Sequence, residues 1–280
     1  MRKKFSILAL FAIFSFLSFI CLGQNQNHNS SSQHKKDQHH YEDESIPKAH
    51  LHLKFLKKKH YAPMPVELYA SKSKAAKGMT IVLYEFDFGD GQAKKIISKT
   101  KINHIYEILS NKSRQKFIVS LRVQDNSGKW SRPYKQNLEL KQIPDPGEKG
   151  KQTLEGIDLD EDGVRDDIQL YISQEFKDEL PVLREALRRS AIAITKNLMS
   201  YQDKVQNIKD NHKALDSLLC VSYFESKVKD IGLRVYGKMI NTQLRVQAET
   251  ATDKNFNGET RRMKQFEDMS KRCDFNIDQF

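Results

Sequence analysis

The sequence lacks the short motifs that carry the commonest enzyme chemistries. No His-Glu-x-x-His, Gly-x-Ser-x-Gly, Gly-x-x-x-x-Gly-Lys-Ser/Thr or Cys-x-x-Cys pattern occurs among its 280 residues. No two carboxylates can be assigned to opposite sides of a cleft. We therefore expect a noncatalytic binding or adhesion protein. The alternative is a hydrolase, or an accessory subunit of a secreted hydrolase, whose active site lies in the C-terminal part of the chain.

Long apolar runs are also scarce, and the one that exists is at the N-terminus. Three basic residues at positions 2–4 precede residues 5–22, which contain no charge, glycine or proline. This pattern predicts a signal peptide over residues 1–23, with cleavage before Gln24, and hence a periplasmic, cell-surface or secreted protein with no mature transmembrane helix. An uncleaved anchor and a lipoprotein anchored through Cys21 are the alternatives.

Cysteine is rare, with three in the chain. Cys21 leaves with the signal peptide, so an even pair, Cys220 and Cys273, enters an oxidising compartment. We predict that these two form a disulfide bond.

Residues 24–47 contain almost nothing that could be buried, and they predict a flexible polar tether. Seven of the nine histidines lie between positions 28 and 60. Because they show no tetrahedral metal-ligand spacing, we interpret them as part of a polar spacer, with a loose transition-metal site as the alternative.

Residues 48–141 alternate apolar and polar side chains in short runs separated by turn signals. The runs lie at residues 51–55, 65–69, 80–88, 94–98, 117–123 and 133–140. This spacing predicts an antiparallel β-sandwich. Between the third and fourth runs, Gly89 and Gly91 can adopt positive φ, and Asp87 and Asp90 can accept hydrogen bonds from amides two residues on.

Three motifs in this region resemble those of the PKD domain, an immunoglobulin-like β-sandwich. Residues 84–91, Tyr-Glu-Phe-Asp-Phe-Gly-Asp-Gly, resemble its signature, with Phe86 in place of the usual tryptophan. His104-Ile105-Tyr106 and residues 119–128 match the two motifs that follow. The resemblance implies structural roles for His104 and Tyr106, with the tyrosine hydroxyl bonded to a backbone carbonyl.

Residues 142–157 have the proline, glycine and charge content of a linker. An acidic loop follows it. Asp158, Asp160 and Asp162 occupy the first, third and fifth places of the loop, and Gly163 allows a sharp turn at the sixth. The backbone carbonyl of Val164 and the side chains of Asp166 and Asp167 complete the predicted calcium ligands.

Gln169 stands at the twelfth place, where an EF-hand has glutamate, so we expect weaker binding than in an EF-hand. The loop resembles the aspartate-rich calcium repeats of thrombospondin type 3 and dockerin modules. Its Asp-Gly-Val-Arg-Asp-Asp segment resembles an element found in exported bacterial proteins. The alternative is an acidic helix N-terminus without a metal.

From residue 166 onward the apolar period becomes helical. Leu183, Leu187, Ala191, Ile194 and Leu198 form one stripe, and further helices are predicted at 208–224, 228–239 and 243–248, with a last one toward residue 272. The sequence therefore predicts two domains: the sandwich at 48–141, and a mainly helical domain at 158–280 that begins with the calcium loop.

The chain carries a formal net charge of +11, but the charge is unevenly distributed. Residues 48–141 contain 20 Lys and Arg against 7 Asp and Glu, whereas residues 156–280 contain 20 against 22. A basic sandwich favours an anionic polysaccharide, lipid headgroups or an acidic envelope protein as partner, more than nucleic acid. We predict an anionic-ligand surface at Lys57, Lys58, Lys59, Lys94 and Lys95, and the alternative is a solvated basic surface with no partner.

Overall fold

The structure, a computed structural model, describes residues 44–225, 230–259, 269–277 and 280. The predicted signal peptide with Cys21, and nearly all of the tether, therefore lie outside the described residues. Contacts divide the chain after residue 42, so all the elements below belong to one unit. No described helix is both long enough and apolar enough to cross a membrane.

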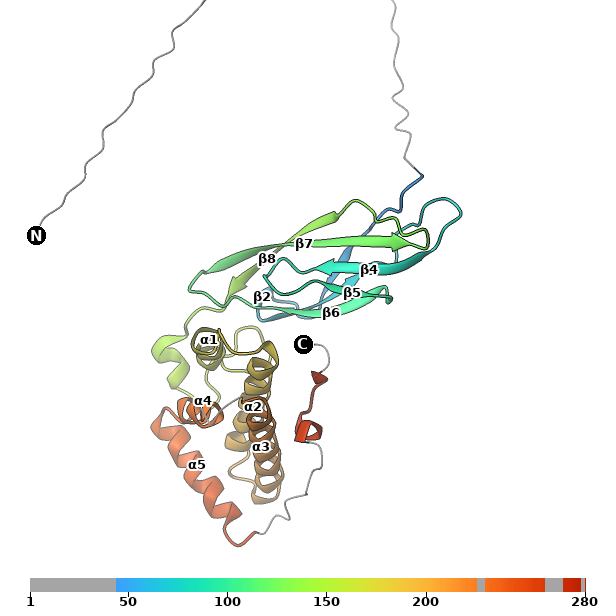
Figure 1. The fold of residues 1–280 in the computed structure, drawn as a ribbon. Helices are drawn as coiled ribbons and strands as arrows, with labels where there is room; N and C mark the ends of the chain where they lie inside the picture. The colour runs from blue at the N-terminus through green and yellow to red at the C-terminus, as the bar shows by residue number, and fades with distance from the viewer. Residues whose placement is uncertain (1–43, 226–229, 260–268, 278–279) are drawn as a thin grey trace, which may run out of the picture. The chain divides into compact units, whose positions relative to one another are not determined.

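The first part of this unit is a two-sheet β-sandwich (Figure 1). One sheet has the order β1-β3-β6 and the other has the order β2-β8-β7-β4-β5. Neighbouring strands pair antiparallel except β2 with β8. The strands are β1 His52–Phe55, β2 Tyr61–Ala62, β3 Met64–Tyr69, β4 Ile81–Asp87, β5 Lys95–Ile97, β6 Lys101–Tyr106, β7 Arg114–Asp125 and β8 Tyr134–Gln142.

The sandwich core joins the inward faces of both sheets. Val66 and Leu68 from β3 belong to the same buried cluster as Phe86, Val119 and Leu121 from the larger sheet. This arrangement is the sandwich that the alternating pattern predicted, because each strand turns every second side chain inward.

Two strands, β2 and β6, were not predicted, and a third, β7, is longer than predicted. In β6 the apolar residues Ile102 and Ile105 do not alternate, and only His104 and Tyr106 are buried, so the apolar signal was weak. β2 has two residues, too few for any periodicity. β7 begins at Arg114, because its polar start pairs with the end of β8, where Arg114 faces Lys141.

The glycine turn after β4 is formed as its residues predicted. Asp87 accepts a hydrogen bond from the Gly89 amide at 3.1 Å, and Asp90 accepts one from the Gln92 amide at 3.0 Å. Gly89 has a φ of 72°, and a Cβ there would lie 2.3 Å from the carbonyl oxygen of Ile118. Only glycine fits this position.

His104 and Tyr106 have structural positions, although one expected bond is absent. The His104 ring stacks on Phe88 with centroids 3.7 Å apart, and its Nε2 lies 2.7 Å from a carboxylate oxygen of Asp90. The Tyr106 ring is fully buried, but among the described residues its hydroxyl has no hydrogen-bond partner. The rings of His104 and Phe117 surround the Tyr106 ring, so the expected bond to a backbone carbonyl is not made.

The second part of the unit is helical and has its own core (Figure 1). The elements are the 3₁₀ helix η1 Gly147–Lys151, the α-helices α1 Asp166–Glu175, α2 Pro181–Met199, α3 Lys204–Phe224, α4 Ile231–Met239 and α5 Gln243–Phe256, and the 3₁₀ helix η2 Met269–Arg272. The predicted stripe on α2 is buried along its whole length. Cys220 of α3 is disulfide-bonded to Cys273, which confirms the predicted pair.

The ends of three helices differ from the predictions. α3 begins at Lys204, α4 begins at Ile231, and α5 continues to Phe256. Residues 226–229 and 260–268, on which parts of two predicted helices fall, lie outside the described residues.

The segment with a linker composition is attached to the helices by Arg245 of α5. The side chain of Arg245 is fully buried and donates hydrogen bonds to the carbonyl oxygens of Gly150, Thr153 and Leu154 at 2.8 to 3.1 Å. These bonds satisfy backbone acceptors that lie outside regular structure, and they fix the approach of the chain to the acidic loop.

Candidate metal centre

The acidic loop lies between η1 and α1, and its own carboxylates fix its backbone. Asp158 accepts hydrogen bonds from the amides of Asp162 at 3.2 Å and Gly163 at 2.8 Å. Asp166 accepts one from the Leu159 amide at 2.9 Å. Gly163 has a φ of 91°, in the region that favours glycine. The loop thus makes the sharp turn that the glycine at its sixth place predicted.

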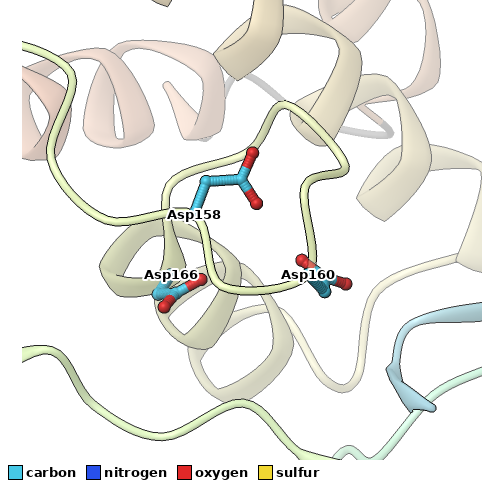
Figure 2. A group of neighbouring side chains, drawn as sticks. All are labelled: Asp158, Asp160 and Asp166. Carbon is cyan, nitrogen blue, oxygen red and sulfur yellow. The ribbon is translucent and has the colours of Figure 1, made fainter. Parts of the chain in front are cut away.

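Three carboxylates converge within this turn, those of Asp158, Asp160 and Asp166 (Figure 2). One oxygen from each lies within 4.8 Å of those from the other two. Asp160 and Asp166 are buried, with 6% and 1% of their surface exposed. Hard cations such as calcium prefer carboxylate oxygens of this kind, supplied from a short loop.

The electrostatics of the cluster favour a bound cation. Burial raises the pKa of Asp160, although Lys57 acts in the opposite direction. Burial also raises the pKa of Asp166 to about 6, and the charges of Asp158, Asp160 and Asp162 act in the same direction. The carboxylates therefore lose stabilisation when they ionise side by side, and a cation among them would restore it.

One buried oxygen in the cluster lacks a partner. Among the described residues, Oδ1 of Asp160 accepts no hydrogen bond, and the Asp160 side chain is fully buried. Buried carboxylate oxygens are normally paired. The carboxylates present therefore fit a divalent cation, with Asp158, Asp160 and Asp166 as the side chains that would hold it.

Two of the remaining predicted ligands, Asp162 and Asp167, have other partners. Asp162 accepts hydrogen bonds from the Val164 amide at 2.8 Å and from Lys57. Asp167 is paired with the guanidinium of Arg165 at 2.8 and 3.0 Å, away from the cluster. The structure thus groups three of the five predicted side-chain ligands, and the backbone carbonyl of Val164 stays a prediction.

Gln169, at the twelfth place, contacts the sandwich. Its side-chain nitrogen donates to the carbonyl of Ala62 at 3.1 Å. Gln169, which stands where an EF-hand has glutamate, therefore connects the helical part to the end of β2.

A lysine ammonium group already occupies part of the acidic loop. Nζ of Lys57, in the connection between β1 and β2, lies 2.9 Å from Asp160 and 2.7 Å from Asp162. Nζ of Lys59 lies 2.7 Å from Glu161 and 2.5 Å from the carbonyl of Leu159. Two of the five lysines predicted to bind an external anion thus contact carboxylates of the acidic loop.

The other three predicted lysines lie elsewhere. Lys94 precedes β5 and pairs with Asp87 at 3.3 Å. Lys58 and Lys95 are exposed and form no ion pair with the described residues. Lys58 lies in the connection between β1 and β2, whereas Lys95 begins β5, so the five lysines come from two separate segments of the sandwich.

Sequence reasoning missed a second charged cluster at the same junction. The side chain of Glu107, directly after β6, is 7% exposed and accepts hydrogen bonds from Arg184, at 2.5 and 2.9 Å, and from Arg188. The i, i+4 spacing of the two arginines places them on one face of α2. That spacing was the available signal, but nothing near Glu107 in the sequence marks it as their partner.

In comparisons with known proteins, parts of the chain resemble solved β-sandwich domains with low TM-scores. No protein-family model and no curated protein matches the chain. The PKD1 domain of Vibrio anguillarum Epp is 22% identical with a TM-score of 0.26, over 35% of this chain and 95% of that domain. The PKD domain of the human VPS10 domain-containing receptor SorCS2 is 17% identical with a TM-score of 0.25, over 47% and 98%.

A solved structure of carbohydrate-binding modules from the β-sandwich superfamily is 24% identical with a TM-score of 0.30, over 38% of each chain. These scores are too low to support a function. The β-sandwich rests on the strand order described above.

Proposed function

We propose that this chain is an exported, noncatalytic binding protein that holds calcium in its acidic loop and binds an anionic partner through its PKD-like sandwich. The observation that carries the calcium proposal is the group of Asp158, Asp160 and Asp166, in which a buried Asp160 oxygen has no partner among the described residues. The Lys57 ammonium at the same carboxylates supports it, because positive charge is favoured at this position of the loop.

Calcium suits this loop better than magnesium. Calcium accepts six to eight oxygen ligands in flexible geometry, whereas magnesium demands a nearly regular octahedron. Three side-chain oxygens, a backbone carbonyl and water meet the less strict requirement. The ion would serve a structural purpose, since it would neutralise carboxylates at the junction of the sandwich and the helices.

Calcium titration into metal-free protein tests the proposal by isothermal calorimetry and thermal denaturation. We expect one site per chain and a higher melting temperature. At a free calcium concentration 100 times the dissociation constant, the folded state gains about 2.7 kcal/mol. Magnesium at equal concentration should produce a smaller shift.

Asp160→Asn should abolish both the binding heat and the melting shift. Asp178→Asn is the matched control, because Asp178 is exposed and lies outside the loop. Calcium binding that is absent in the parent protein, or equal in the parent and the Asp160→Asn variant, would rule out this site.

A further inference from the structure

A cavity of about 330 Å³ lies at the junction of the sandwich and the helices, beside the acidic loop. Its size is in the range of small-molecule binding sites. The sandwich contributes residues around β1, β3 and β6, and α2 closes the other side. Its apolar walls are Leu56, Pro65, Val66, Ile105, Val164 and Ile192.

The charged groups of the cavity offer more donors than acceptors. Its cations are Lys57, Arg188 and Arg189, and its anions are Asp162 and Glu185. Both anions are already engaged: Asp162 by Lys57 at 2.7 Å, and Glu185 by Arg189 at 2.8 Å and Arg188 at 3.6 Å.

Several N–H donors of these arginines have no hydrogen-bond acceptor among the described residues. Within the described chain, Nε of Arg188 is buried without a hydrogen-bond partner, and Arg189 makes its only side-chain bond through Nε. A guanidinium carries five N–H donors, so the terminal nitrogens of Arg189 remain available. The side-chain amide of the exposed Asn103 lies on the opposite wall. A ligand that satisfies these groups must bring acceptors, and a carboxylate matches a guanidinium best.

We propose that this cavity binds a carboxylate-bearing sugar, the repeating chemistry of an acidic polysaccharide. The carboxylate pairs with Arg189, the hydroxyls meet Asn103 and Glu185, and the C–H face of the ring packs on the apolar wall. The inference rests on the anionic partner of the proposed function. It places the recognition of the sugar in the junction cavity, so the exposed lysines contribute only long-range attraction of the polymer.

Calorimetric titration of the full-length protein with D-glucuronate tests this, with D-glucose as the matched neutral sugar. We expect one site and at least about tenfold tighter binding of glucuronate than of glucose, because glucose lacks the carboxylate. A glucuronate oligomer that binds more tightly than the monomer identifies a polysaccharide source, whereas equal affinity identifies a free sugar acid. Equal binding of glucuronate and glucose, or no binding of either, overturns the proposal.

Two variants and one control locate the site. Arg189→Gln and Asn103→Asp should each weaken glucuronate binding at least tenfold. Asn103 is exposed, so its variant keeps the fold, which unchanged thermal denaturation would verify. Lys213→Gln is the control, because Lys213 and Arg189 both line a second cavity of about 390 Å³ beside the disulfide. Loss of binding in Lys213→Gln but not in Asn103→Asp would place the ligand in that second cavity and overturn the proposal.

The calcium proposal and the sugar-binding proposal can be tested independently. Glucuronate binding should persist in a chelator and in Asp160→Asn, because the groups proposed to bind the sugar, on Arg189, Asn103 and Glu185, lie outside the acidic loop. A protein that binds glucuronate but not calcium refutes only the metal proposal, and the reverse result refutes only the sugar site.

Discussion

Lys57 belongs to the sandwich and contacts the acidic loop that begins the helical part, where we propose the calcium site. Its ammonium bonds to Asp160 and Asp162, and 18% of its side-chain surface is exposed. A calcium ion in the loop would compete with this ammonium for the same carboxylates. Since the ion pair must loosen when the metal enters, Lys57 lowers the affinity of the loop for calcium.

Lys57→Met should therefore tighten calcium binding by about fivefold, since a partly exposed ion pair is worth on the order of 1 kcal/mol. Isothermal calorimetry at constant ionic strength measures the change. Lys58→Met, an adjacent exposed lysine, should leave the affinity unaltered. If Lys57→Met instead binds calcium more weakly than Lys58→Met, the lysine orders the carboxylates for the metal and the competition argument is wrong.

What could be predicted for single residues depended on the distance along the chain between the partners. Asp87 and Asp90 bond to amides two residues away, so the composition of the turn was enough to predict those bonds. The contact of Lys57 with Asp160 spans 103 residues, and no local pattern encodes it. The same limit applies to Asp167, whose sequence position suits a calcium ligand but whose neighbour Arg165 pairs with it.

At the scale of elements, β6 and α2 are joined through a buried carboxylate. Glu107 forms ion pairs with Arg184 and Arg188, and the side chains of all three are almost fully buried. Burial opposes ionisation, but the two guanidinium groups hold the pKa of Glu107 below its usual value. An ionised partner is therefore retained at this junction, and its removal would leave two buried cations uncompensated.

Glu107→Gln should lower the free energy of unfolding by about 3 to 5 kcal/mol, the cost of breaking a buried pair by removing one partner. Urea denaturation followed by circular dichroism measures this. Glu139→Gln is the matched control, because Glu139 is exposed and its ion pairs with Arg114 and Lys116 are 3.6 and 3.7 Å long. It should change the stability by less than about 1 kcal/mol. Equal losses for the two variants would show that Glu107 does not hold the junction.

Elements with strong periodicity could be predicted, and elements stabilised mainly by their neighbours could not. The strand of β3 and the stripe of α2 have apolar residues at the periods of a strand and a helix, and both are present. β2 exists because its two residues pair with the end of β8. β6 lies beside β3, and its burial is confined to two aromatic rings. Neither has a pattern of its own that is long enough to detect.

At the scale of the whole molecule, the composition predicted two cores and a basic sandwich, but not their junction. The sandwich and the helices have separate buried clusters. Hydrogen bonds between the two parts involve the side chains of Lys57, Glu107 and Gln169, and no sequence pattern indicates which partners they have. Charge in the sandwich is therefore divided between residues that bind the helical part and residues that remain exposed.

This division gives a last prediction about the anionic partner. Lys58 and Lys95 are exposed without an ion pair among the described residues, so they can attract an acidic polysaccharide. Lys58→Glu and Lys95→Glu should each weaken its binding, and for two neutralised charges the affinity should fall about tenfold between 50 and 200 mM salt. Biolayer interferometry with an immobilised uronic acid polymer measures both effects.

The control is Lys149→Glu, the same charge change at an exposed position of η1 outside the sandwich. It should reduce binding less than either sandwich variant, because Lys149 does not belong to the basic sandwich. Binding that is insensitive to salt, or that responds equally to all three reversals, would mean that the positive charge of the sandwich only keeps it solvated. In that case recognition of the polymer would have to come from the junction cavity alone, where Arg189→Gln would abolish it at any salt concentration.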